Sequence, residues 1–308
     1  MRDQFIETLS VLASSNPKIV LITGDLGFGV FDDYIKNFPN QFINAGVSEQ
    51  NMTLLATGMA MEGYIVFTYS IANFSTLRCL EMIRNDAAYH DANVKIVSIG
   101  GGFSYGSLGI SHHATEDLSI MRAIPNLTCL SPSGFSEVIE CTKAMVETPG
   151  ACYLRLDKDP GYNESNEKFI LGKPRKIQTG NDIAFFVTGG IMSEVVKASE
   201  ILDKDYDIKP SIFSIHTIKP INFTSTIEEL KKYKLIVTVE ENTIIGGLGS
   251  LMLETLSNEN IYPNKFLRIG LDGCFSSVVG SQEYLRKTYN MSSGSIVRQV
   301  LKSFNDTK

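Results

Sequence analysis

The sequence lacks the features that mark several classes of protein. Its 308 residues carry a formal net charge of −6, so there is no basic excess of the kind that binds nucleic-acid phosphates. No apolar run approaches the roughly 18 residues that cross a bilayer. The start Met-Arg-Asp-Gln does not resemble a signal peptide. We therefore expect a cytoplasmic protein with no nucleic-acid partner and no membrane contact.

Residues that commonly bind metals are scarce and scattered. There are four histidines, of which two are adjacent, and five cysteines, an odd number. No pair of the cysteines has the spacing of metal ligands. The cysteines are Cys79, Cys129, Cys141, Cys152 and Cys274. We expect no metal site in this chain, and buried, reduced thiols.

What is present is the alternation of an α/β protein. The composition is 43% hydrophobic and 20% charged, and the length allows two domains of about 150 residues each. Short apolar strands, such as 19–22, 94–99, 183–187 and 235–239, alternate with helical patterns. This predicts two consecutive α/β domains with mostly parallel sheets. We expect them at 1–160 and 181–308, with a polar, Gly- and Pro-containing linker at 161–180.

The most informative stretch is 42–52, where an apolar segment leads through Gly46 into a helical pattern. Ser48 is a candidate cap of this helix, which would place Glu49 in the first turn. A carboxylate there complements the positive helix end. By itself, this pattern is typical of a glutamate on a surface helix.

The amino-acid sequence around Glu49 resembles that of a known family. The segment 44–52, Asn-Ala-Gly-Val-Ser-Glu-Gln-Asn-Met, is similar to the one that carries the cofactor-activating glutamate of transketolases and other thiamine diphosphate enzymes. Further similar segments follow in the family's order: 1–5, 24–26, 83–89, 111–113, 124–126, 217–220, 237–241 and 246–250. The resemblance implies the thiamine diphosphate-binding fold and covers the last two of the family's three domains. Gly246-Gly-Leu-Gly lacks the full nucleotide-binding fingerprint, so we interpret it as a close-packed helix start.

One part of the family pattern is missing. Transketolases hold the diphosphate and a divalent metal with Gly-Asp-Gly and an asparagine about 30 residues on, and here only Gly24-Asp25-Leu26 is similar. We interpret it as a turn from a strand into a loop, since motifs need their context. The resemblance therefore implies one half of a split transketolase. An N-terminal partner subunit would hold the diphosphate and Mg²⁺ or Ca²⁺, in a heterotetramer.

The resemblance also assigns cofactor contacts. Glu49 would protonate N1′ of the aminopyrimidine, and an apolar environment suits this task because it favours the protonated acid. Phe74 matches the aromatic residue that stacks on the pyrimidine, although without the family it would be a core phenylalanine. Ile71 stands where transketolases often have a second aromatic residue, and Arg78 lies in the same segment.

Substrate contacts are implied in the same way. His112 matches the histidine that bonds substrate oxygens and moves protons, and His113 is the alternative. Arg2 and Arg155 match two arginines that bind substrate phosphate, a task that suits the guanidinium fork. Taken singly, the histidines would be solvated loop residues and the arginines surface ion pairs.

Three positions depart from transketolases that use sugar phosphates. Gly29, Gly100 and Leu108 stand where that group has a serine, a histidine and an aspartate that reads a substrate hydroxyl. We expect the glycines to open space and Leu108 to disfavour a hydroxyl, because burying one without a partner costs about 1–3 kcal/mol. The acceptor would then be bulkier or less hydroxylated than ribose 5-phosphate, unless neighbouring residues or the partner chain replace the missing groups.

The implied function is transfer of a two-carbon ketol unit from a ketose to an aldehyde acceptor, both small sugars, at a site shared with the partner. One alternative is the beta subunit of a 2-oxo acid decarboxylating dehydrogenase, which has the same domain order. Arg2 and Ser111-His112 favour the transketolase. Another is a catalytically silent assembly subunit, which would need neither Glu49 nor Phe74.

Overall fold

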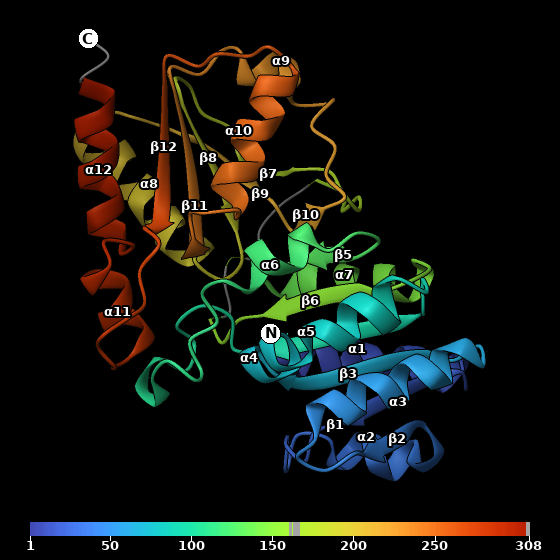
Figure 1. The fold of residues 1–308 in the computed structure, drawn as a ribbon. Coiled ribbons are helices and arrows are strands. Elements are labelled where there is room, and N and C mark those ends of the chain that lie inside the picture. The colour runs from blue at the N-terminus through green and yellow to red at the C-terminus, as the bar shows by residue number, and fades with distance from the viewer. Residues whose placement is uncertain (160–161, 163–166, 306–308) are drawn as a thin grey trace.

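The computed structural model describes residues 1–159, 162 and 167–305, and two β-sheets organise them (Figure 1). The first sheet consists of β1 (Ile19–Thr23), β2 (Phe42–Asn44), β3 (Ile65–Ile71), β4 (Val94–Ile99), β5 (Thr128–Leu130), β6 (Cys152–Leu156) and β10 (Thr217–Lys219). The second consists of β7 (Arg175–Gln178), β8 (Ile183–Thr188), β9 (Ser211–Ser214), β11 (Leu235–Thr243) and β12 (Lys265–Leu271).

Both sheets are mostly parallel. Their strand orders are β10-β5-β6-β4-β3-β1-β2 and β12-β11-β8-β9-β7. In each sheet one terminal strand runs antiparallel to its neighbour, β10 against β5 and β7 against β9. Strands β1, β4, β6, β8 and β11 are buried along their whole length, as strands covered on both faces must be. The predicted pair of mostly parallel α/β domains is confirmed.

The first sheet is covered on both faces. Its helices are α1 (Arg2–Ser15), α2 (Asp32–Asn37), η1 (Pro39–Gln41), α3 (Glu49–Met61), α4 (Ala72–Ser75), η2 (Leu77–Cys79), α5 (Leu80–Met82), η3 (Ile83–Ala88), η4 (Gly106–Leu108), α6 (Asp117–Ala123) and α7 (Phe135–Glu147). Phe5 of α1 and Val138 of α7 belong to the core of one face. Met52 of α3 and Leu118 of α6 belong to the core of the other.

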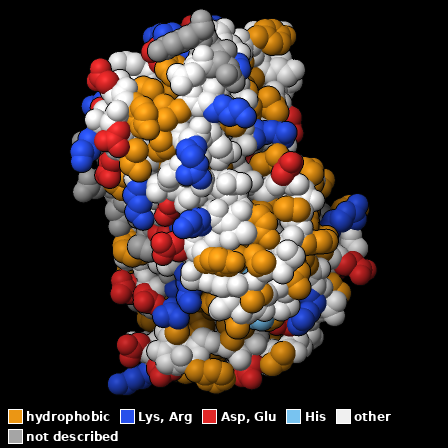
Figure 2. Space-filling model, turned by 90° about the vertical axis from the view of Figure 1, so that its left-hand side faces the viewer, with side chains coloured by type: hydrophobic (Ala, Val, Ile, Leu, Met, Phe, Trp, Pro, Cys, Tyr) orange, Lys and Arg blue, Asp and Glu red, His pale blue; other side chains and the backbone are white. Residues whose placement is uncertain are grey.

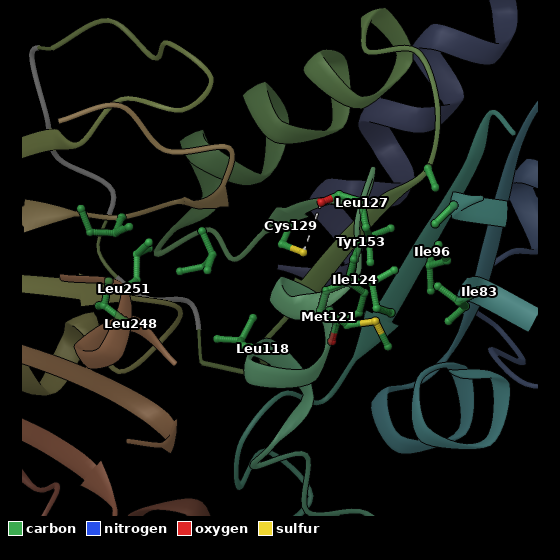
Figure 3. Packing of buried hydrophobic residues seen from close by; sticks show 14 of the residues in the cluster. Ile83, Ile96, Leu118, Met121, Ile124, Leu127, Cys129, Tyr153, Leu248 and Leu251 are labelled. Carbon is green, nitrogen blue, oxygen red and sulfur yellow. Dashed lines mark hydrogen bonds between the residues drawn. The ribbon is translucent and has the colours of Figure 1, made fainter. Parts of the chain in front are cut away.

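The second sheet has α8 (Met192–Tyr206), α9 (Ile227–Leu230), α10 (Leu248–Asn258), α11 (Gln282–Thr288) and α12 (Ser293–Asn305) around it. Helices α8 and α12 lie side by side against one face (Figure 1). Leu248 and Leu251 of α10 pack on the other side, in a core that also contains Leu118 and Tyr153 of the first domain (Figure 3). The two domains therefore both contribute to this one of the hydrophobic cores.

A strand also crosses between the domains. Strand β10 follows β9 in the chain, but Thr217 and Lys219 pair with Leu130 and Cys129 at the edge of the first sheet. In the other direction, β7 of the second sheet lies within 161–180, the stretch whose composition indicates a linker. The second sheet thus begins before residue 181, because a polar stretch can still supply an edge strand.

The segment after β3 differs from the prediction. The pattern of 74–90 predicts one long helix, but the chain forms α4, η2, α5 and the π-helix η3 in succession. The Ser75 hydroxyl donates to the Ile71 carbonyl (3.1 Å) and the Thr76 hydroxyl to the Ala72 carbonyl (2.6 Å). Such side-chain bonds compete with the helix. Thr76 has φ −111° and ψ −78°, and the α-helix stops there.

Cysteine burial and helix length complete the comparison. Cys79, Cys129, Cys141 and Cys152 are buried free thiols, whereas Cys274 is exposed, so the prediction of burial is wrong for Cys274. Within 1–159 and 167–305, no helix combines the length and apolar character that crossing a membrane requires.

Candidate active site

Glu49 is the first residue of α3, just after the turn that leaves β2. Gly46 in this turn has φ +74°, which glycine adopts without strain. Ser48 occupies the N-cap position, but its hydroxyl donates to the Ala45 carbonyl (2.8 Å), so the predicted side-chain cap is wrong. The Glu49 side chain is 2% exposed and lies against Gly24, where a Cβ would sit 3.4 Å from Cγ of Glu49.

The Glu49 carboxylate pairs with Arg78, whose guanidinium lies 3.0 Å from Oε2. The same guanidinium lies over the ring of Phe74, 4.9 Å from its centroid. The Gln50 side chain donates to the Arg78 carbonyl (3.1 Å) and fixes the backbone. The Arg78 side chain is 50% exposed, so it covers the outer side of the buried carboxylate. A flat cation therefore fills a space bounded by a carboxylate and an aromatic ring.

His112 lies beside the same aromatic ring. Its imidazole meets the ring of Phe74 edge-on, with centroids 5.1 Å apart, and its Nδ1 lies 3.0 Å from the Ser111 hydroxyl. Partial burial, and then the neighbouring His113, lower the pKa of His112. The lowered pKa favours the neutral imidazole, which can accept a proton from a bound hydroxyl.

His113 has a different place. Its ring is buried, and Nε2 lies 2.9 Å from the Gly106 carbonyl. Because a carbonyl only accepts, Nε2 carries the proton and donates it. Asn73, which the sequence reasoning missed, donates to the carbonyls of His113 (2.8 Å) and Ser111 (3.3 Å). His113 and Asn73 thus hold the loop, and His112 is the member of the pair that faces the site.

A small pocket of about 180 Å³ lies beside the glycine-rich loop, which we define as residues 100–113. Arg2, Tyr105 and Lys158 line it together with Asp3 and Asp157. The Arg2 side chain pairs with Asp3 (2.8 Å), and the Lys158 ammonium lies 5.1 Å from the Tyr105 ring centroid. Sequence reasoning missed Lys158, although its position just beyond the carboxyl end of β6 is where parallel sheets bind ligands.

Known families match both parts of the chain. The model of the transketolase pyrimidine-binding domain matches residues 1–161, and that of the transketolase C-terminal domain matches 172–296. The chain belongs to the transketolase family.

Relatives of similar length occur among split transketolases. A protein of Methanocaldococcus jannaschii named as a transketolase C-terminal section is 37% identical, over 98% of this chain and 95% of its own. One of the subunits of the apulose-4-phosphate transketolase of Phocaeicola vulgatus is 31% identical, over 87% and 86%. The SqwH subunit of the 6-deoxy-6-sulfo-D-fructose transketolase of a Clostridium species is 31% identical, over 97% and 92%.

A solved structure agrees with these matches. A chain described as a split-gene transketolase in an inactive beta4 tetramer superposes with a TM-score of 0.89 and 29% identity. The superposition covers 100% of this chain and 99% of that one. This chain is therefore a transketolase-like subunit of the split type.

The expectation that Arg155 binds substrate phosphate does not fit the structure. Its side chain is 2% exposed and pairs with Asp117 (3.3 Å) and Asp157 (3.2 Å). It also donates to the Glu241 carbonyl (2.9 Å) across the domain boundary. These neighbouring carboxylates raise the pKa of Arg155 against the opposing effect of burial. The N–H groups of Arg155 thus bond to partners inside the chain. Of the two predicted arginines, Arg2 is the exposed one.

Two of the three unusual positions also differ from expectation. Gly100 opens no space, because a Cβ there would lie 2.2 Å from the ring of Tyr105, which fills the site. Leu108 is 55% exposed at the end of η4, so this chain alone does not bury it. At Gly29 a Cβ would meet no atom within 4 Å, as predicted for open space.

Two further predicted positions have contacts within this chain. Ile71, at the end of β3, packs with the core under α1 and α7. Gly24 and Asp25 form a bend directly after β1, and the Asn44 side chain donates to Asp25 Oδ1 (2.9 Å) and accepts from the Asp25 N–H (3.1 Å). The predicted turn is confirmed. Outside the undescribed positions, no group of three or more His, Cys, Asp or Glu side chains is placed to hold a metal ion.

The glycines before α10 pack closely, as predicted. Glu240 in β11 is fully buried, and its carboxylate accepts the N–H groups of Leu248 and Gly249 (both 2.8 Å). A Cβ at Gly247 would lie 2.0 Å from this carboxylate. The loop therefore supports the helix start and leaves no room there for a nucleotide.

Proposed function

We propose that this subunit takes part in the transfer of a two-carbon ketol unit from a ketose to an aldehyde, in complex with a partner subunit that holds the diphosphate and metal. One arrangement carries the proposal: a buried glutamate, an aromatic face and a neutral histidine meet at Glu49, Phe74 and His112. Thiamine diphosphate, when bound, supplies a nucleophilic carbon for such a transfer. The chain's own residues supply the proton and the position.

The space beside Glu49 fits the aminopyrimidine. Arg78 shows that a flat, nitrogen-bearing group can hydrogen-bond to Glu49 and lie on Phe74 at the same time. Glu49 would hold a proton at N1′, and Phe74 would set the plane of the ring. Arg78 would move outward along its exposed side. Its charge stabilises the carboxylate that Glu49 becomes once the proton is given away.

This chain exposes apolar side chains that a partner subunit would cover. Figure 2 shows the face from which the glycine-rich loop protrudes, with hydrophobic side chains gathered below its middle. Leu108 and Ile110 of this loop and Val279 beside it are more than half exposed. Apolar side chains next to a catalytic histidine suit a subunit interface. An N-terminal partner with the diphosphate-binding domain, in a heterotetramer, would close the site there.

The acceptor would be an anionic sugar that differs from ribose 5-phosphate. Arg2 and Lys158 would bind its anion, while open space at Gly29 and the side chain of Leu108 favour bulk or a missing hydroxyl. Deoxy and nucleotide-linked sugars are the examples to test. Two relatives are named for substrates outside the standard sugar phosphates, apulose 4-phosphate and 6-deoxy-6-sulfo-D-fructose. The second is a ketose and hence a ketol donor, so the proposal for the acceptor rests on the residues of this chain.

The test is reconstitution with a partner chain that has the Gly-Asp-Gly element. Calorimetry should show tight, Mg²⁺-dependent thiamine diphosphate binding by the complex and only weak binding by this chain alone. The complex should transfer ketol units from ketoses. Decarboxylation of pyruvate without turnover of ketoses would instead identify a 2-oxo acid dehydrogenase subunit.

Competition between acceptors decides the substrate class. If ribose 5-phosphate turns over with a kcat/KM near about 10⁴ M⁻¹s⁻¹ or above, the proposed departure from standard sugar phosphates fails. A deoxy or nucleotide-linked acceptor preferred by at least about tenfold would support it, since one unpaired buried hydroxyl costs about that much.

A further inference from the structure

The loop that carries His112 runs directly along the second domain. A Cβ at Gly101 would lie 1.9 Å from Nε of Arg155, and a Cβ at Gly102 would lie 2.6 Å from Oε1 of Glu241. Gly102 also has φ +57°. Only glycine allows the backbone to pass this close to both side chains. Gly101 is thus required by a contact with Arg155 of the first domain, and Gly102 by a contact with Glu241 of the second.

Glu241, at the end of β11, holds this loop with its carboxylate. Its Oε1 accepts the N–H of Phe103 (2.6 Å) and a side-chain N–H of Gln282 (2.9 Å). Its Oε2 accepts Nε–H of Arg286 (2.5 Å), and the side chain is 2% exposed. A buried carboxylate needs such partners to offset the loss of water. Three donors from α11 and the loop therefore meet at one carboxylate.

Phe103, which donates its N–H to Glu241, also contacts His113, the neighbour of His112. The Phe103 ring stacks on Tyr289 (5.5 Å) and meets the buried His113 ring edge-on (5.1 Å). His113 donates to the Gly106 carbonyl, which also accepts the N–H of Gly280 (3.2 Å). The residue before His113 is His112. A shift of the Phe103 backbone therefore moves the base of the loop that presents His112 to Phe74.

We propose that Glu241 is a positioning residue, through which the second domain fixes the glycine-rich loop and thereby His112. The effect on catalysis rests on the proposed function, whereas the effect on the loop does not. Glu240 is the matched control. It precedes Glu241 in the same strand, it is also buried, and its carboxylate faces α10 and makes no bond to the loop.

The first experiment is hydrogen exchange of the full chain, for Glu241→Gln and Glu240→Gln. A glutamine keeps the size of the side chain but offers one oxygen to the three donors. We expect amides of 102–113 to exchange about tenfold to a hundredfold faster in Glu241→Gln, the effect of losing a bond to a charged group. In Glu240→Gln the faster exchange should lie at the start of α10. Unchanged loop exchange in Glu241→Gln, or equal effects in both variants, would overturn the proposal.

The second experiment uses the complex with the partner subunit and a ketose that the unmodified complex turns over. Glu241→Gln should lower kcat about tenfold and leave proton exchange at the cofactor C2 within about twofold, since Glu49 is untouched. Glu240→Gln should change neither. A loosened loop with an unchanged kcat would refute the catalytic part. If the unmodified complex turns over no ketose, the proposed function fails, and hydrogen exchange still decides the role of Glu241 in the loop.

Discussion

Glu49 and Glu241 are equally buried, and each pairs with an arginine, but their surroundings differ. Glu49 meets Arg78, which is half exposed, whereas Glu241 meets Arg286, which is 4% exposed and also pairs with Asp159. The carboxylate of Glu241 accepts hydrogen bonds from a loop and a helix, whereas the ion-pair partner of Glu49 is half exposed to solvent. A buried carboxylate whose single cation can move aside suits exchange of a partner, and one with several buried partners suits a fixed structure.

The largest effect on stability should come from removing a buried cation that has several buried partners. Arg155→Met removes the cation that compensates Asp117 and Asp157, so we expect the free energy of unfolding to fall by about 3–5 kcal/mol. Thermal or denaturant unfolding of the chain measures it. Arg298→Met, at an exposed position of α12, is the control and should change stability by less than about 0.5 kcal/mol. A loss for Arg155→Met as small as that would mean the network is not needed.

The pH dependence of stability should follow Glu240. Burial raises its pKa to about 7 from an ordinary value near 4.5. The folded chain thus binds this proton more tightly than the unfolded chain, so the stabilisation is complete below about pH 4.5 and is lost as the pH rises to 7. The loss amounts to at most about 3 kcal/mol. Denaturant titrations from pH 4.5 to 7.5 should show a flatter profile for Glu240→Gln, and parallel profiles would contradict the assignment.

Glu49→Gln tests the carboxylate whose arginine partner is half exposed. The amide keeps the shape but cannot give a carboxyl proton to N1′, so we expect proton exchange at C2 in the complex to slow by at least about 10²-fold. The unfolding midpoint should stay close to that of the unmodified chain. Glu62→Gln, at the exposed end of the same helix, should leave exchange unchanged. Normal exchange in Glu49→Gln would remove this residue from the role.

Arg78→Gln should have the smallest effect. Arg78 is half exposed, so its pairing with Glu49 is worth about 1 kcal/mol after screening, and stability should change by no more than that. Since the lost charge also stabilised the carboxylate form of Glu49, proton exchange at C2 should slow about fivefold. Arg84→Gln, an exposed neighbour in η3, is the control. A loss as large as that of Glu49→Gln would show that Arg78 does more than stabilise a charge.

The sequence predicted the fold because short buried strands have a clear pattern. Strand β4, expected at 94–99, occupies those residues, and β8 differs from its prediction by one residue. The broken segment at 72–88 was not predicted, since the hydroxyl bonds of Ser75 and Thr76 compete with a helix without changing its apolar periodicity.

Part of the candidate site could not be predicted from the sequence. Residues within one motif were placed together correctly, as Phe74 and Arg78 show. Arg155 was not, because its partners Asp117 and Glu241 lie far away in the chain and only folding brings them to it. The same is true of Glu241, whose partner Phe103 belongs to the other domain. Local patterns reveal neighbours along the chain and leave contacts between domains to the structure.

Strand β10 has a consequence for how such a protein can be divided. Because it is made after β9 yet completes the edge of the first sheet, a cut anywhere between β6 and β10 would leave the pyrimidine-binding half with an uncovered β5. An uncovered edge strand pairs with other chains and promotes aggregation. Separate genes for these two domains would therefore yield fragments that fold poorly unless they met at once. The pair is expected to be inherited, expressed and exchanged between enzymes as one piece.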